Sequence, residues 1–290
     1  VMANLGKPKE NYVVIAGIGC SSRFPYYMET YGFHTIHGRA PAFVSGLKAT
    51  RPELSVWMVT GDGDGLSIGG NHLIHLLRRN IDVNVMMFNN RIYGLTKGQY
   101  SPTSKQGTKT KSSPMGSIDA PFNPIQLALG AQSAWVARSI DVFAAHLREV
   151  LTAADGHKGT SFIEIYQNCI IFNDKAFGDI TDKQYREEKV LYLKNGEPLA
   201  WGAEGERKGL IQSGFALEIV DANTDEEIAR CLLHDTGNRI LAQLLADFDG
   251  HDGTPLPIGV FYDKPRATYD SQFNEQVAES RKKLGPGDIE

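Results

Sequence analysis

Short apolar runs alternate with stretches of helical periodicity as far as residue 173. The runs are rich in Val, Ile, Met and Phe and are too short for helices, so they predict buried strands. Between them, apolar residues recur every three or four positions, which predicts amphipathic helices. We expect strands at residues 12–16, 33–36, 56–59, 83–88, 134–137 and 161–167. We expect helices at residues 42–50, 68–79, 122–130 and 142–154.

Strands that alternate with helices predict a doubly wound parallel α/β sheet, because each strand–helix–strand unit places its two strands parallel and usually adjacent. After residue 173 the pattern changes. Residues 190–193 and 198–201 predict a hairpin around an Asn195-Gly196 turn. Further strands are expected at 215–220 and 258–262, and helices at 226–233, 239–248 and 273–284. We therefore expect an α/β domain at residues 1–174 and a mixed C-terminal extension at residues 175–290.

Two polar loops end the strands of the central strand–helix–strand unit. Gly61-Asp62-Gly63-Asp64-Gly65 follows the first strand, and Asn89-Asn90 follows the second. Neighbouring strands lie about 4.8 Å apart, and parallel strands present their carboxyl ends at one edge. A carboxylate and an amide oxygen that meet there suit Mg²⁺, and the glycines let backbone N–H groups approach a phosphate. The pattern predicts a metal-bridged diphosphate.

Other interpretations of these glycine-rich loops are weaker. An ordinary turn with solvated aspartates stays possible at Asp62, but a calcium-binding loop does not fit. Counted from Asp62, its fifth and twelfth positions are Leu66 and Leu73, which offer no oxygen ligand. The earlier loop Gly17-Ile18-Gly19-Cys20 lacks the third glycine of a dinucleotide-binding fingerprint.

The composition excludes several classes of function. The formal net charge is −4, so no basic field favours nucleic acid. No apolar run approaches the roughly 18 residues that a membrane helix needs. The 3 cysteines are widely spaced, which argues against a disulfide framework and for a reducing cytoplasm. We expect a cytoplasmic protein that binds neither nucleic acid nor membranes.

The motifs resemble those of a known enzyme family. GDG, followed after 25 residues by NN, is similar to the thiamine diphosphate (TPP) signature. The longer strings GDGDGLSIGGNHLIHLLRRN and FNNRIYGLTKGQYSPTS resemble the β subunits of the 2-oxoacid:ferredoxin oxidoreductases, in particular the 2-oxoglutarate type, and the resemblance weakens only beyond Gly205. It implies oxidative decarboxylation of 2-oxoglutarate to succinyl-CoA and carbon dioxide, with coenzyme A as acceptor and electrons passed to ferredoxin. The reverse reductive carboxylation is equally implied.

The resemblance also implies roles for individual residues. Mg²⁺ would be bound by Asp62, the side chain of Asn90 and the backbone carbonyl of Ile92. The other cofactor contacts would come from Gly19, Cys20, Gly61, Gly63, Asp64, Gly94 and Leu95. Arg23 and Lys97 would select the substrate, although a single surface cation is usually only solvated. His37 and Leu95 are the candidate catalytic residues, and a loop histidine is as often a structural group.

Two cysteines predict a second cofactor. Cys20 and Cys169 each follow a predicted strand, so both are expected at the same edge of the sheet. A lone cysteine is usually a small buried hydrophobic residue, which is our interpretation of Cys231. Two converging thiols indicate an iron–sulfur cluster, which normally takes four thiolates. The resemblance implies a 4Fe-4S cluster whose other two ligands form a CxxC motif before Val1.

The resemblance further implies that the chain is half of an active site. An α subunit would supply the pyrimidine-binding domain and the activating glutamate, in a heterotetramer of two αβ pairs. Three alternatives stay open: an enzyme for pyruvate or for 2-oxoacids in general, a non-redox TPP decarboxylase subunit, and a regulatory TPP-binding module. Residues 93–119 lack apolar periodicity, which is typical of a functional loop, and we expect residues 98–117 to act as a lid.

Overall fold

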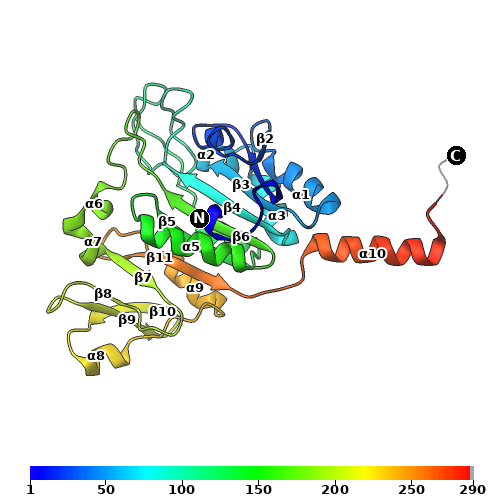
Figure 1. Ribbon diagram of the computed structural model, residues 1–290. Coiled ribbons are helices and arrows are strands. Elements are labelled where there is room, and N and C mark those ends of the chain that lie inside the picture. Colours follow the sequence, from blue (N-terminus) through cyan, green and yellow to red (C-terminus); the bar gives the residue numbers. More distant parts are fainter. Residues whose placement is uncertain (288–290) are drawn as a thin grey trace.

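A computed structural model describes residues 1–287 of the chain. Eight strands form one large sheet in the order β2-β1-β3-β4-β6-β5-β11-β7 (Figure 1). Its strands are β1 Tyr12–Ala16, β2 Tyr31–His34, β3 Ser55–Gly61, β4 Val83–Asn89, β5 Trp135–Ile140, β6 Thr160–Tyr166, β7 Val190–Leu193 and β11 Leu256–Asp263. Every neighbouring pair is parallel except β11 with β5. The predicted parallel α/β sheet is confirmed, with one antiparallel pairing added by the C-terminal extension.

Helices cover both faces of this sheet, as a doubly wound fold requires. The helices are α1 Ala40–Thr50, α2 Asp62–Leu66, α3 Gly70–Arg79, α4 Pro124–Gly130, α5 Ala144–Gly156, α6 Gly178–Thr181, α7 Lys183–Lys189, α8 Asp225–Arg230, α9 Arg239–Ala246 and α10 Tyr269–Leu284. Alternate residues of β1 face opposite layers. Val13 and Ile15 join the core beneath α1, α3, α4 and α9, whereas Val14 and Ala16 join the core beneath α5. Strands buried on both faces explain the unbroken apolar runs.

The C-terminal extension is not separate from the large sheet. The predicted hairpin is wrong: β7 pairs with β11 in the large sheet, whereas β8 (Ala200–Trp201) pairs with β9 (Lys208–Ser213). The Asn195-Gly196 turn lies between strands that enter different sheets, and the Gly196 N–H donates to the His234 carbonyl. A second, three-stranded sheet has the order β10-β9-β8, with β10 at Ala216–Asp221. Two strands of the extension therefore complete the large sheet.

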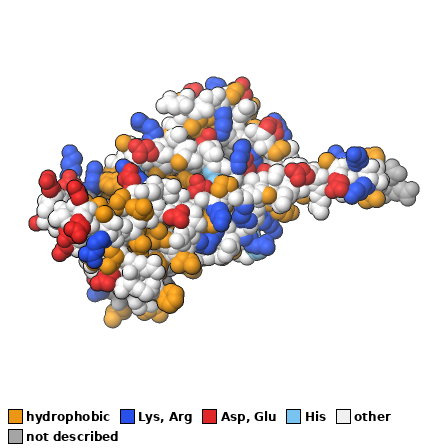
Figure 2. All heavy atoms as spheres, turned by 90° about the horizontal axis from the view of Figure 1, so that it is seen from below, with side chains coloured by type: hydrophobic (Ala, Val, Ile, Leu, Met, Phe, Trp, Pro, Cys, Tyr) orange, Lys and Arg blue, Asp and Glu red, His pale blue; other side chains and the backbone are white. Residues whose placement is uncertain are grey.

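The segments that follow β3 and β11 form the helices α2 and α10. The glycine-rich segment after β3 is not an open loop, because its residues form the single helical turn α2, and α3 begins at Gly70 rather than at residue 68. At the other end of the chain, α10 projects from the body and carries Arg281, Lys282 and Lys283 in its last turn (Figures 1 and 2). Among the described helices, none has the length and apolar character needed to cross a membrane.

Candidate cofactor site

A cavity of about 220 Å³ lies at the carboxyl ends of β1, β3 and β4. Segments that follow these three strands and β2 form its walls. The wall residues are Ile18, Gly19, Cys20, Ser21, His37, Gly61, Asp62, Gly63, Asp64, Ser67, Ile68, Phe88, Asn90, Ile92, Tyr93, Gly94, Leu95 and Thr96. All the residues expected to contact TPP or Mg²⁺ are among them. The structure thus brings one set of predicted residues together at the predicted edge.

Asp62 is a buried carboxylate on this wall. Its side chain is 2% exposed, and its Oδ2 accepts hydrogen bonds from Ser101 Oγ at 2.5 Å and Thr103 Oγ1 at 2.6 Å. Burial raises the pKa of Asp62, and the two hydroxyls only partly oppose that rise. These donors are neutral, and within the described part of the chain no cation forms an ion pair with the carboxylate. A buried anion with neutral donors, open to a cavity, is a suitable ligand for a cation.

The two asparagines after β4 have different surroundings. Asn90 lines the cavity, and its Oδ1 accepts a hydrogen bond from the Ile92 N–H at 3.2 Å. Asn89 is 2% exposed; its Nδ2 donates to Glu164 Oε1 at 2.8 Å, and its Oδ1 accepts from the Arg91 N–H at 3.2 Å and lies 2.9 Å from Thr103 Oγ1. Asn90 is therefore available to a ligand, whereas Asn89 is used inside the protein.

Asp64 is already occupied by contacts within the chain. Its Oδ1 accepts from the N–H groups of Ile18 at 3.1 Å and Gly38 at 2.7 Å, and its Oδ2 accepts from Thr60 Oγ1 at 2.7 Å. A Cβ on Gly17 would lie 1.9 Å from that Oδ2, so the loop after β1 approaches it closely. The carboxylate ties the loops after β1 and β2 to β3. Its contact with a diphosphate stays a prediction.

Two glycines mark close approaches on the cavity wall. A Cβ on Gly63 would lie 2.1 Å from Cε1 of Tyr93, whose hydroxyl donates to the Gly63 carbonyl at 3.3 Å. A Cβ on Gly94 would lie 3.6 Å from the Sγ of Cys169 and 3.7 Å from the Sγ of Cys20. The predicted convergence of the two thiols is therefore seen beside Gly94. Within residues 1–287, no group of three or more His, Cys, Asp and Glu side chains could hold a metal by itself.

The predicted substrate cations lie outside this wall. Arg23 is exposed, with its guanidinium 5.8 Å from the ring centroid of Tyr27. Lys97 is exposed in a left-handed conformation with φ of 77°, and its N–H donates to the Gly94 carbonyl at 3.0 Å. His37 is exposed on the wall itself. The structure places both cations near segments that form the wall without bringing them into the cavity.

Sequence reasoning missed a buried cluster of hydroxyl groups beside Asp62. Ser101, Thr103 and Ser104 are each no more than 3% exposed, although they belong to the segment expected to move as a lid. The first residues of that segment are held against Asp62 by the hydrogen bonds of Ser101 and Thr103. Tyr93 was also missed, and burial raises the pKa of its hydroxyl. The sequence signal for these buried hydroxyl groups was the cluster of Ser and Thr residues after Tyr93, and this cluster has no periodicity that would indicate burial.

Comparisons with known proteins agree with this geometry. The family model described as thiamine pyrophosphate enzyme, C-terminal TPP binding domain, matches residues 14–165. The chain is 52% identical to 2-oxoglutarate oxidoreductase subunit KorB of Mycobacterium tuberculosis over 97% of its own length and 75% of that protein. It is 36% identical to 2-oxoacid:ferredoxin oxidoreductase 1, subunit beta, of Aeropyrum pernix, over 94% and 76% of the two chains.

A solved structure is similar over nearly the whole chain. It is the 2-oxoglutarate:ferredoxin oxidoreductase from Magnetococcus marinus with 2-oxoglutarate, coenzyme A and succinyl-CoA bound. The TM-score is 0.75 and the identity 31%, over 99% of this chain and 82% of that one. The similarity therefore includes the C-terminal extension as well as the cavity.

Proposed function

The chain belongs to the β subunits of the 2-oxoacid:ferredoxin oxidoreductases, and we propose that its cavity holds TPP and Mg²⁺ for the oxidative decarboxylation of 2-oxoglutarate. The TPP-binding fold and the enzyme class follow from the family. The choice of 2-oxoglutarate is supported by the relatives named for that substrate. The observation that carries the proposal is Asp62, a buried carboxylate with only neutral side-chain donors on a cavity wall shared with Asn90.

The donor set fits Mg²⁺. The proposed protein ligands are a carboxylate oxygen of Asp62, Oδ1 of Asn90 and the backbone carbonyl of Ile92, all of them hard oxygen donors. Phosphate oxygens commonly complete such a site. Gly63 packs directly against the Tyr93 ring, because a Cβ there would lie 2.1 Å from Cε1 of that ring.

When bound, TPP supplies the carbon nucleophile that attacks the 2-oxo carbon, once a carboxylate of the α subunit has activated it. This chain's contribution is to hold and shape the site. Asp62 and Asn90 fix the metal-bound end of the cofactor. Leu95 and Gly94 line the cavity, and His37, which also lines it, is the side chain proposed to act on bound substrate. Coenzyme A accepts the succinyl group.

Cys20 and Cys169 are proposed as two ligands of a 4Fe-4S cluster that passes electrons to ferredoxin. Their sulfur atoms approach one point beside Gly94, so a cluster there would adjoin the cofactor cavity. Arg23 and Lys97 are proposed at the rim, because a dicarboxylate needs a cation beyond those that bind its 2-oxoacid end. We expect two αβ pairs.

The test uses the αβ complex purified without oxygen. We expect iron and bound TPP, and a cluster signal in paramagnetic resonance that appears on addition of 2-oxoglutarate and coenzyme A but not of pyruvate. Cys20→Ser is expected to lose the cluster. Cys231→Ser is the matched control, because Cys231 is buried and its Sγ donates to the Glu227 carbonyl. TPP without iron would identify a non-redox enzyme, and equal reduction by pyruvate would identify a general 2-oxoacid enzyme.

A further inference from the structure

A continuous line of buried polar side chains leads from the sheet core to Asp62. Arg138 Nε donates to Glu164 Oε2 at 2.7 Å, and Glu164 Oε1 accepts from Asn89 Nδ2. Asn89 Oδ1 in turn contacts Thr103 Oγ1, which reaches Asp62 Oδ2. We call these five residues the buried polar chain. Their exposed fractions lie between 0% for Glu164 and 3% for Thr103.

The orientation of Asn89 is fixed from both ends. Its Nδ2 donates to the Glu164 carboxylate, and its Oδ1 also accepts from the Arg91 N–H at 3.2 Å. The reversed amide would set an oxygen against a carboxylate oxygen, so it is excluded while Glu164 is ionised. Glu164 is paired with Arg138, which is 2% exposed. The ion pair thus holds Asn89 in one orientation.

The Thr103 hydroxyl has one hydrogen and three oxygen neighbours, two of which, Asp62 Oδ2 and Asn89 Oδ1, lie closer than the third, Ser101 Oγ at 3.3 Å. Its Oγ1 lies 2.6 Å from Asp62 Oδ2 and 2.9 Å from Asn89 Oδ1, and a hydroxyl can donate to only one of them. A hydrogen bond to a charged acceptor is about twice as strong as one to a neutral acceptor. The Thr103 proton is therefore directed to Asp62. Ser101 donates to the same Oδ2, and neither hydroxyl bonds to Oδ1.

We propose that Thr103 is a positioning residue whose hydroxyl, together with that of Ser101, fixes the Asp62 carboxylate so that it presents Oδ1 to the cation. The inference rests on the proposed function. Groups that orient a metal ligand in this way commonly change metal affinity by about 10–100-fold. A stiffly held carboxylate favours Mg²⁺, which needs near-ideal octahedral geometry, over Ca²⁺, which tolerates irregular geometry.

The test compares three variants of the αβ complex in the presence of TPP. Thr103→Val removes the hydroxyl at nearly constant volume, Thr103→Ser restores it, and Thr108→Val is the matched control. Thr108 lies in the same segment and its Oγ1 bonds only to the Lys105 carbonyl. The measurements are Mn²⁺ binding by paramagnetic resonance and the Mg²⁺ and Ca²⁺ concentrations needed to retain TPP in dialysis.

We expect Thr103→Val to raise the half-saturating Mg²⁺ concentration by about 10-fold or more and to narrow the preference for Mg²⁺ over Ca²⁺. Thr103→Ser is expected to stay within about 3-fold of the unmodified complex, and Thr108→Val to be unchanged. Ser101→Ala removes the second hydroxyl and is expected to act in the same direction with a smaller effect. If the Thr103→Val complex does not assemble, the half-saturating Mg²⁺ concentration of Ser101→Ala tests whether these hydroxyls position Asp62.

Two failures are distinguishable. If the unmodified complex does not retain TPP with Mg²⁺, the proposed function fails. If it does, and Thr103→Val needs no more Mg²⁺, the positioning role is overturned. The role is also overturned if Thr103→Ser is as impaired as Thr103→Val, because Thr103 then acts only by filling space.

Discussion

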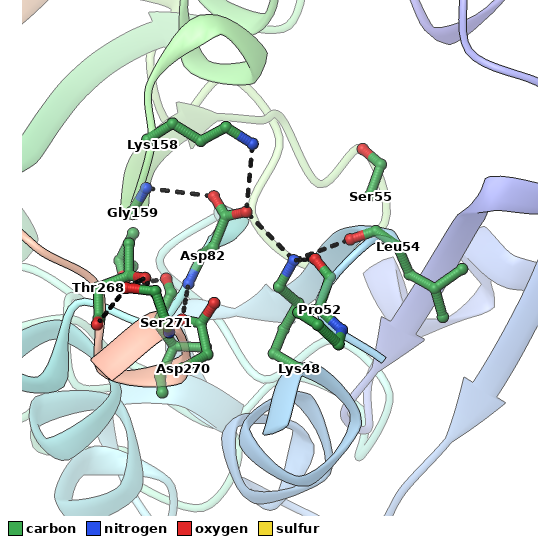
Figure 3. A network of polar contacts seen from close by, with 12 residues as sticks. Lys48, Pro52, Leu54, Ser55, Asp82, Lys158, Gly159, Thr268, Asp270 and Ser271 are labelled. Atoms are coloured by element: carbon green, nitrogen blue, oxygen red, sulfur yellow. Dashed lines mark hydrogen bonds and ion pairs between the residues drawn. The ribbon is translucent and has the colours of Figure 1, made fainter. Parts of the chain in front are cut away.

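The two ends of the central strands each carry a buried or half-buried aspartate, and the aspartates have opposite surroundings. At the amino end, Lys48 is 1% exposed, and its Nζ donates to the carbonyls of Pro52 and Leu54 and to Asp82 Oδ2 at 3.1 Å (Figure 3). Asp82 Oδ1 accepts from the Gly159 N–H at 3.2 Å. At the carboxyl end, Asp62 has hydroxyl donors, and no cation of residues 1–287 pairs with it.

This difference in surroundings indicates that the Lys48–Asp82 site is structural, whereas Asp62 belongs to a ligand-binding site. Lys48 joins α1 to the turn before β3 and to the start of β4, and the Asp82 N–H donates to Asp270 at the start of α10 (Figure 3). The two carbonyls and the carboxylate around the Lys48 ammonium group have donors from the chain. Asp62 lacks only a positive charge, and a buried charge is costly until it is paired. We infer that the amino end is complete by itself, whereas the carboxyl end is completed by a cation.

The largest expected effect is on stability at the amino end. Lys48→Met removes the buried ammonium group, which donates to two carbonyls and to Oδ2 of Asp82, so we expect the complex to lose about 3 kcal/mol of unfolding free energy. Urea denaturation measures it. Lys158→Met is the control, because that side chain is 85% exposed at 3.7 Å from Asp82, and we expect a change of about 0.5 kcal/mol or less. Weaker Mg²⁺ binding in a folded Lys48→Met complex would contradict the proposed division.

Asp62→Asn tests the carboxyl end with an isosteric change. It removes the charge while keeping an acceptor for Ser101 and Thr103, so we expect Mg²⁺-dependent retention of TPP to weaken by about 100-fold, equivalent to about 2.7 kcal/mol. Without cofactor, the variant should be at least as stable as the original chain, because a buried uncompensated charge has gone. Equilibrium dialysis and urea denaturation give the two results. Retained affinity would remove Asp62 from the metal site.

Much of this contrast could be predicted from the sequence, because the large sheet has unusually clear signals. Its central strands are buried on both faces, so each is an apolar run, and the strand ends fix which loops share an edge. The prediction of a hairpin was wrong because Asn195-Gly196 specifies a turn but does not specify the partners of the flanking strands. Val190 and Leu191 pack in the large sheet, whose strand β11 comes more than sixty residues later.

The remainder of the site could not be predicted because it depends on contacts distant in sequence. Nothing local distinguishes Asn89 from Asn90, and their different roles are set by Glu164 on the neighbouring strand β6. Thr103 lies 41 positions after Asp62 in a segment without regular structure. Lys48, a typical surface residue by type, is buried because three oxygen atoms surround its ammonium group.

Metal removal gives a smaller effect that sharpens the comparison. A ligand at about ten times its dissociation constant stabilises the folded state by about 1.4 kcal/mol. Dialysis of the TPP-loaded complex against a chelator should therefore lower its melting temperature. Lys48→Met should show the same decrease from a lower starting point, and Asp62→Asn should show none. A chelator effect that persists in Asp62→Asn would mean that the cation binds elsewhere.

The smallest expected effect is the response of the amino end to acid. His157 is 9% exposed beside Asp263, with Nδ1 and Oδ1 3.2 Å apart. Burial lowers the pKa of His157 below its usual 6.5, and the nearby carboxylates of Asp263 and Asp82 only partly oppose this. The His157 side chain therefore binds a proton more readily in the unfolded chain than in the folded chain. Its contribution to the unfolding free energy is fully present above pH 6.5 and is lost as the pH falls below 6.5.

One such histidine changes the unfolding free energy by at most about 1.4 kcal/mol per pH unit. Burial also lowers the pKa values of His146 and His234, so these two side chains add to the pH dependence of stability. We expect His157→Gln to make the stability of the complex less dependent on pH between 6.5 and 5.5, measured by urea denaturation at fixed Mg²⁺ and TPP. Its half-saturating Mg²⁺ concentration at pH 7.5 should stay unchanged, because His157 contributes to the amino end alone. An unchanged slope would show that His157 does not carry this acid sensitivity, and altered Mg²⁺ binding would show that the two ends of the sheet are coupled.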